Sequence, residues 1–130
     1  MYAQHLTMDG DFDGIIEKPI WDNIEQAIRR LDGKKNTEVI FGPGGEDRYM
    51  LVSGGNNGQY IAIITYDNET FHNIIDPSKA DDALVNLVCG GQAADFSARQ
   101  VNSLEPVLKA ANSYAVAGEV DKSLDWSKNY

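Results

Sequence analysis

The residues best suited to metal chemistry form an acidic loop near the start of the chain, Asp9-Gly10-Asp11-Phe12-Asp13-Gly14. Aspartates at the first, third and fifth positions with glycine at the sixth match the first half of a calcium-binding EF-hand loop. The second half departs from this pattern, because Ile20 stands at the twelfth position, where a bidentate glutamate is required. No helix is predicted before the loop either. The sequence therefore favours an acidic surface loop over a functional calcium site, and it predicts no other metal and no cofactor.

The candidates for nucleophilic catalysis are the single cysteine, Cys89, and the two histidines, His5 and His72. Cys89 ends an apolar run, where a cysteine is more often a small buried hydrophobic residue than a nucleophile. Neither histidine belongs to a catalytic motif. The glycine-rich stretch at residues 54–58 lacks the lysine and the following helix of a phosphate-binding loop. These absences favour a protein that is not an enzyme, with catalysis through Cys89 or a histidine as a less favoured alternative.

Arg99 closes a stretch that begins with two glycines, Gly90–Arg99, between an apolar run and a helical pattern. An arginine in such a place can bind a partner's carboxylate, or it can hold Asp95 or backbone carbonyl groups of its own chain. We favour the internal role. In this interpretation Gly90–Arg99 is a rigid bend that sets the following helix on the sheet.

Two helices must position these residues. The first is predicted between Pro19 and Gly33, because one apolar stripe recurs at steps of three and four residues. The stripe consists of Trp21, Ile24, Ile28 and Leu31. The second helix is predicted from about Ser103 to Ala117, with Gly118 as its stop.

Strand-like runs separated by glycine-rich or acidic turns lie between the two helices, at residues 37–41, 48–53, 60–66, 70–75 and 84–89. A short strand is also expected within residues 1–8. Short turns make the first four runs an antiparallel meander. The prediction is one α+β domain over residues 1–130, with a largely antiparallel sheet of about five to six strands and two helices packed on it.

Acidic side chains outnumber basic ones by 20 to 11, which gives a net charge of −9. Such a charge repels phosphate backbones and attracts basic proteins, so a basic protein is the expected partner and nucleic acid is not. Many carboxylates occupy predicted turns, where one partner could meet several together, although any single group could be no more than a solvated surface. The candidate partner-binding residues are Asp9, Asp11, Asp13, Glu46, Asp47, Asp67, Glu69, Asp81 and Asp82.

A single cysteine permits no internal disulfide, which is typical of a reducing compartment. The first residues lack the basic region and apolar core of a signal peptide, and no apolar run approaches the length of a membrane span. The sequence therefore predicts a soluble cytoplasmic protein.

An ordered series of short motifs runs through the chain. It begins with Trp21 and Arg30-Leu31-Asp32-Gly33, followed by Met50-Leu51-Val52-Ser53-Gly54-Gly55 with Tyr60, and then Asp76-Pro77. It continues with Gly90-Gly91-Gln92-Ala93-Ala94-Asp95-Phe96-Ser97-Ala98-Arg99, a helix with Ala110, Ala111, Tyr114 and Gly118-Glu119, and finally Leu124-Asp125-Trp126. In this order the motifs resemble the first-numbered family of immunity proteins, which accompany deaminase and nuclease toxins of bacterial polymorphic toxin and contact-dependent inhibition systems. The resemblance covers residues 19–126. Residues 1–18 lie outside it, and Tyr114 stands where an aromatic residue, often phenylalanine, is usual.

The resemblance implies a cytoplasmic bacterial antitoxin without catalytic activity, which binds a cognate toxin domain in a 1:1 complex and blocks its active site or its access to substrate. A toxin that acts on nucleic acid needs a basic surface, which an acidic inhibitor can occupy. Toxin specificity would lie in the variable turns. The alternative is an acidic adaptor protein with a weak calcium site at Asp9–Asp13. The residues implied as family scaffold are Trp21, Gly54, Gly55, Gly91, Gln92, Phe96, Arg99 and Trp126.

Overall fold

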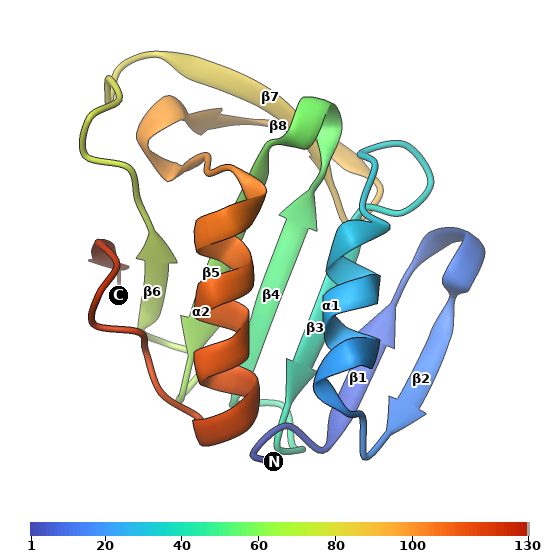
Figure 1. Ribbon diagram of the computed structural model, residues 1–130. Helices are drawn as coiled ribbons and strands as arrows, with labels where there is room; N and C mark the ends of the chain where they lie inside the picture. The colour runs from blue at the N-terminus through green and yellow to red at the C-terminus, as the bar shows by residue number, and fades with distance from the viewer. Residues whose placement is uncertain (130) are drawn as a thin grey trace.

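Two helices lie side by side on one face of a seven-stranded antiparallel sheet (Figure 1). The computed structural model describes residues 1–129. The predicted α+β class is confirmed. Neither helix in the described chain is long and apolar enough to cross a membrane.

The main sheet has the strand order β2-β1-β3-β4-β5-β6-β9. Its strands are β1 (His5–Met8), β2 (Gly14–Glu17), β3 (Glu38–Gly42), β4 (Tyr49–Gly54), β5 (Tyr60–Thr65), β6 (Phe71–Ile74) and β9 (Trp126–Asn129). Two further strands, β7 (Leu84–Cys89) and β8 (Gln92–Ser97), pair only with each other. The helices are α1 (Trp21–Arg29) and α2 (Leu104–Ala117), and short 3₁₀ turns occur at η1 (Gly10–Phe12), η2 (Asn56–Gly58) and η3 (Ala98–Gln100). The predicted meander is confirmed as β3 to β6.

Both helices begin and end close to the predicted residues. At the start of α1, Asn23 Oδ1 accepts a hydrogen bond from the Ile20 backbone N–H at 2.9 Å, which satisfies one of the free donors of the first turn. The helix ends at Arg29, somewhat before Gly33, which was the predicted stop. Ser103 precedes α2, and Gly118 follows it in the left-handed conformation.

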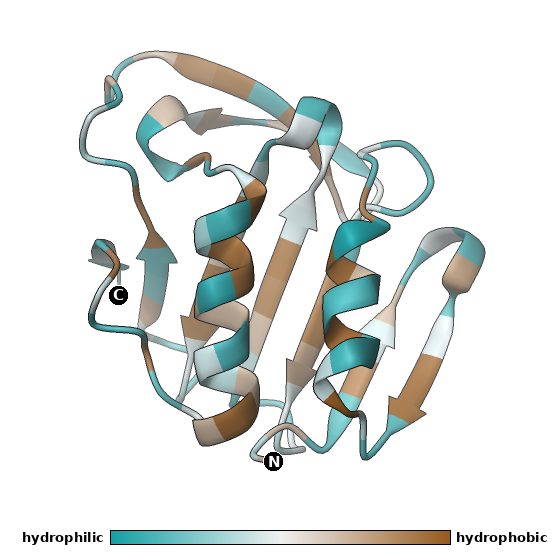
Figure 2. Cartoon of the chain, viewed as in Figure 1, coloured by the Kyte–Doolittle hydropathy of each residue, from teal (hydrophilic) through white to brown (hydrophobic). Residues whose placement is uncertain are grey.

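The core lies between the sheet and the two helices, and hydrophobic residues dominate the central strands (Figure 2). Tyr114 of α2 is fully buried at its centre. Its ring makes edge contacts with Tyr2 and Phe41, at centroid distances of 5.3 and 5.9 Å, and a tilted contact with Tyr66 at 6.1 Å. Burial raises the pKa of the Tyr114 hydroxyl, so this group stays neutral throughout the physiological range. These contacts tie the chain's first residues, β3 and the end of β5 to α2.

The predicted number of strands is too low, because three further segments, β2, β8 and β9, are also strands. β2 pairs with β1 and forms one edge of the sheet, and β9 pairs with β6 and forms the other. Such short segments show little periodicity of their own. Their pairing depends on the strand beside them.

The interpretation of Gly90–Arg99 as a rigid bend is wrong: residues 84–97 form a β-hairpin. Gly90 and Gly91 make its two-residue turn with φ of +59° and +81°, and positive φ at both positions is what the tightest hairpin turn requires. The stretch from Gln92 to Asp95 is exposed to solvent, so it lacks the apolar alternation that predicts a strand.

The β7–β8 hairpin crosses one end of the sheet, where β4 finishes, on the side away from the helices (Figure 1). Leu87 is its fully buried residue and lies against Gly54, apart from the main core. Two hydrogen bonds hold the hairpin. The Gly91 N–H donates to Thr37 Oγ1 at 2.9 Å, and the Val88 N–H donates to Asn56 Oδ1 at 3.1 Å.

We expect Leu87→Ala to lower the free energy of unfolding by about 2–5 kcal/mol, because it leaves a cavity where the hairpin meets the sheet. Leu84→Ala in the same strand is the matched control, since Leu84 is 68% exposed, and it should change this free energy by less than about 0.5 kcal/mol. Urea denaturation measures both. Equal losses for the two variants would mean that Leu87 does not anchor the hairpin.

Candidate partner-binding surfaces

The acidic residues predicted to bind a partner lie at two opposite ends of the main sheet. Strands alternate in direction, so the turn between β1 and β2 and the connection after β6 share the end where β4 finishes. Asp9, Asp11, Asp13, Asp81 and Asp82 lie at that end. Glu46, Asp47, Asp67 and Glu69 lie at the other end, in the β3–β4 and β5–β6 turns. The residues therefore form two groups rather than one patch.

Asp9 is engaged within the chain. Its Oδ1 accepts hydrogen bonds from the backbone N–H groups of Thr37 and Glu38 at 2.8 and 3.0 Å, and its Oδ2 accepts one from Thr37 Oγ1 at 2.5 Å. Three donors to one carboxylate fix the β1–β2 turn against the start of β3. Neither oxygen is left without a partner from the chain itself.

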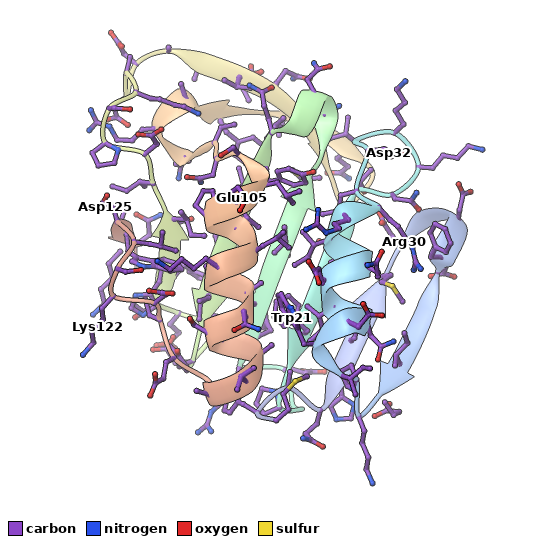
Figure 3. All side chains as sticks on the ribbon, in the orientation of Figure 1. Trp21, Arg30, Asp32, Glu105, Lys122 and Asp125 are labelled. Carbon is purple, nitrogen blue, oxygen red and sulfur yellow. The ribbon has the colours of Figure 1, made fainter. Side chains whose placement is uncertain are left out.

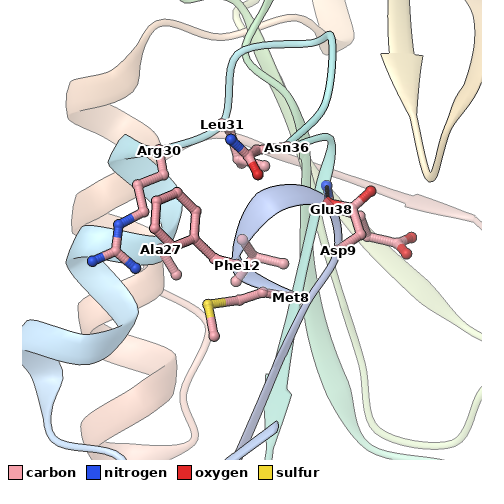
Figure 4. Close-up of a pocket in the computed structure, with 9 residues that line it drawn as sticks. Met8, Asp9, Phe12, Ala27, Arg30, Leu31, Asn36 and Glu38 are labelled. Atoms are coloured by element: carbon pink, nitrogen blue, oxygen red, sulfur yellow. Dashed lines mark hydrogen bonds between the residues drawn. The ribbon is translucent and has the colours of Figure 1, made fainter. Parts of the chain in front are cut away.

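The geometry of the Asp9–Gly14 loop argues against the calcium alternative. The loop joins two strands of a hairpin, whereas an EF-hand loop joins two helices. Phe12 folds back so that the Arg30 guanidinium lies 4.2 Å from its ring centroid, a cation–π contact (Figure 4). The hollow beside them is only about 10 Å³, the limit for one water molecule. No group of three or more His, Cys, Asp or Glu side chains suited to a metal ion occurs in residues 1–129.

Two other predicted carboxylates also hold their own loops. Asp67 Oδ1 accepts hydrogen bonds from the N–H groups of Thr70 and Glu69 at 2.7 and 2.9 Å, and these bonds lower the pKa of Asp67. Asp81 Oδ1 accepts a hydrogen bond from Ser97 Oγ at 3.0 Å. The others are exposed and make no side-chain hydrogen bond or ion pair within the described chain: Asp11, Asp13, Glu46, Asp47, Glu69 and Asp82.

Cys89 is half-buried at the end of β7, beside Ser53. Burial is the main cause that raises the pKa of its thiol to about 11. A thiol with this pKa is almost entirely protonated near neutral pH, and the protonated form is a poor nucleophile.

The face of the main sheet away from the helices is only partly covered. Residues directly opposite each other on neighbouring strands form a row across it. The row runs Ile15, Thr7, Ile40, Leu51, Ile63, Asn73 and Ser127. The aliphatic side chains of Ile40, Leu51 and Ile63 are adjacent and half-exposed at its centre. Reasoning from the sequence missed this row.

Two hollows flank the row on the same face. One, of about 260 Å³, is lined by His5, Ile40, Arg48 and Tyr49 among others, at the end of the sheet that carries the β3–β4 turn. The other, of about 200 Å³, lies between Phe96 of the hairpin and the Ile61 and Ile63 side chains of β5. The uncovered face is therefore apolar at its centre and uneven in relief.

Similarity to a known protein family indicates the class of partner that the chain binds. The model described as Immunity protein Imm1 matches residues 15–128. The chain belongs to the Imm1 family of immunity proteins. The predicted resemblance is confirmed, and family membership supports an antitoxin role in which the chain binds a cognate toxin. No match was found among the curated proteins.

The Imm1 match spans both helices and β3 to β8, and it leaves out Asp9, Asp11 and Asp13. Two of the implied scaffold residues are tryptophans at the starts of elements. Trp21 begins α1 and projects between the helices (Figure 3), where it packs half-buried against the core. Trp126 begins β9, and its Nε1–H donates to the Asp121 carbonyl oxygen at 2.8 Å.

The other implied scaffold residues of the Imm1 motifs gather around the β7–β8 hairpin. Gly54 ends β4 and Gly55 follows it. A Cβ on Gly55 would lie 2.4 Å from the Leu31 carbonyl carbon, so only glycine fits there. Gly91 forms the hairpin turn, Gln92 begins β8 with an exposed side chain, and Phe96 faces β5. Arg99 Nε donates to the Lys79 carbonyl oxygen at 3.1 Å, so its guanidinium binds a backbone carbonyl of its own chain.

We expect Asp9→Ala to lower the free energy of unfolding by about 1–3 kcal/mol, because the Thr37 and Glu38 N–H groups lose their acceptor. Asp11→Ala, two residues away, removes the same charge but no side-chain hydrogen bond and should stay within about 0.5 kcal/mol of the wild type. Urea denaturation is the measurement. A similar stability for the two variants would contradict the structural role of Asp9.

We also expect Cys89 to react with iodoacetamide about 100-fold more slowly at pH 8 than a cysteine with a pKa near 9, since the thiolate is the reactive form. The rate should keep rising up to a pH of about 11. The urea-unfolded chain is the control and should react at the ordinary rate. Fast alkylation of the folded chain at pH 8 would contradict the raised pKa and would support the alternative in which Cys89 is a nucleophile.

Proposed function

We propose that this Imm1 protein neutralises a toxin domain that acts on nucleic acid, a deaminase or a nuclease, by forming a 1:1 complex with it in the bacterial cytoplasm. The observation that carries the proposal is the family match over residues 15–128. The net charge of −9 supports the choice of toxin class, because a protein that holds phosphate backbones must present a basic surface. The inhibitor acts by binding, and its own chain performs no catalysis.

Inhibition follows from competition for the basic surface. The toxin's lysines and arginines bind substrate phosphates, so a carboxylate-rich protein seated on them excludes the substrate without reproducing its chemistry. Long-range attraction between opposite charges also speeds the encounter, which matters for an antitoxin that must act before the toxin damages nucleic acid.

Among the predicted partner-binding residues, the group in the β3–β4 and β5–β6 turns is best placed for this role. Glu46, Asp47 and Glu69 are exposed, and their carboxylates make no hydrogen bonds within the described chain. Tyr49 Oη donates to Asn68 Oδ1 at 2.9 Å and links the two turns. The turns thus present their charges from one connected end of the sheet.

The proposal predicts that the neighbouring upstream gene encodes the toxin domain, and the direct test is co-expression with that domain. Cells expressing that domain alone should stop growing, and cells expressing both proteins should grow. Light scattering after size-exclusion chromatography should give the mass of one copy of each protein. An unrelated acidic protein of similar size and charge is the control and should not rescue growth. If the two proteins neither form a complex nor restore growth, the proposed function is wrong.

The association rate should fall as salt is added, by about tenfold between low and high ionic strength, because screening weakens attraction between exposed charges. The dissociation rate should change much less. Stopped-flow fluorescence at several sodium chloride concentrations measures both rates. An association rate independent of salt would contradict a basic toxin surface.

A further inference from the structure

The central strands of the main sheet are apolar on both faces. In β4, Met50 and Val52 are buried against the helices while Leu51 between them points the other way, and in β5 Ile61 and Ile63 alternate with buried Ala62 and Ile64 in the same manner. An antiparallel sheet with one face in water alternates apolar and polar residues, whereas near-continuous apolar strands occur where both faces are covered. These strands therefore have the composition of a sheet that is covered on both sides.

The chain covers the second face only in part. The β7–β8 hairpin lies over the end where β4 finishes, and Phe96 packs near Ile61 there. The row through Ile40, Leu51 and Ile63 lies nearer the middle of the sheet and remains half-exposed. Strands lie about 4.8 Å apart, so these three side chains form a continuous apolar strip about 10 Å wide.

The next row toward the opposite end of the sheet adds aromatic side chains and leads to the acidic turns. Tyr49 and Phe71 lie in this row, on either side of Thr65, and both are half-exposed. Beyond them come the β3–β4 turn with Glu46 and Asp47 and the β5–β6 turn with Glu69. An apolar centre with aromatic residues and a charged rim is the composition of a protein–protein interface.

The charge of the chain determines which occupant fits this face. A second copy would bring a net charge of −9 against −9. Like charges across an interface oppose association, whereas a basic protein gains attraction from the same rim. The face is therefore suited to a basic partner and not to self-association.

We propose that the toxin docks on this uncovered face, with Ile40, Leu51 and Ile63 at the centre of the contact and Glu46, Asp47 and Glu69 at its rim. The proposal rests on the proposed function for the identity of the partner. It differs from a contact made by acidic turns alone, because the apolar row determines how long the complex lasts and the carboxylates determine how fast it forms.

The experiment measures binding of the purified toxin domain encoded upstream by surface plasmon resonance. Leu51→Arg places a positive charge at the centre of the face and should raise Kd at least about 100-fold. Val116→Arg is the matched control, because Val116 is 51% exposed on α2, on the opposite side of the sheet, and Kd should change less than about threefold. Urea denaturation of each variant checks that it is folded.

Two further variants separate the apolar and charged parts of the contact and do not depend on whether Leu51→Arg folds. The double substitution Leu51→Ala with Ile63→Ala should raise the dissociation rate about 30-fold and leave the association rate nearly unchanged. The double substitution Glu46→Gln with Asp47→Asn should instead lower the association rate and its dependence on salt.

The outcomes discriminate between the possible occupants and between the two proposals. If Leu51→Arg and the double alanine variant both bind the toxin with the wild-type Kd, the toxin does not dock on this face. The same conclusion follows if Val116→Arg raises Kd as much as Leu51→Arg does. Neither result contradicts formation of the toxin complex itself. If the chain alone is a dimer in light scattering and Leu51→Arg makes it a monomer, the occupant is a second copy and the proposal is wrong. If the wild-type chain does not bind the toxin, the proposed function is wrong, and the docking proposal that rests on it is wrong with it.

Discussion

The burial of one face of the main sheet beneath α1 and α2 is the constraint on which the rest of the structure depends. Tyr114 is at the centre of this layer and contacts residues from the start of the chain, from β3 and from the end of β5. Both helices lie on that face, so within residues 1–129 the β7–β8 hairpin is the only pair of strands left to cover the other. A hairpin of two six-residue strands cannot cover a sheet of seven, so part of an apolar face stays exposed.

Polar side chains fix where that hairpin lies. Thr37 Oγ1 donates to Asp9 and accepts from the Gly91 N–H, while Asn56 accepts from the Val88 N–H and donates to the Gly33 carbonyl oxygen at 3.1 Å. Each side chain thus joins segments that are far apart in the sequence. Because buried donors and acceptors are costly to leave unpaired, this pairing holds the hairpin against one end of the sheet and away from the row through Leu51.

The fold was largely predictable where the sequence carries local signals, and the site was not. The apolar stripe of α1, the Gly118 stop and the glycine-rich turns predicted both helices and the β3–β6 meander. β2 and β8 escaped prediction because these short or exposed segments lack apolar alternation, and β9 escaped because it pairs with a strand more than 50 residues earlier. The role of Asp9 escaped because the backbone N–H groups that donate to it are 28 and 29 residues away. The proposed docking row could have been suspected from one signal: β4 and β5 are apolar at consecutive positions, although the prediction placed helices on only one face of the sheet.

The proposed function explains why an exposed apolar row and a high negative charge occur in the same chain. An antitoxin must remain soluble before it meets its toxin, yet a long-lived complex requires apolar contact that water would otherwise drive into self-association. A net charge of −9 resolves this conflict, since it opposes contact between two copies and attracts a basic partner to the same surface. In the proposed complex the charge selects the partner, and the aliphatic row retains it. On this reasoning the acidic turns near Glu46 and Glu69 and the row through Leu51 are two parts of one surface, and neither part alone would provide both rapid encounter and slow release.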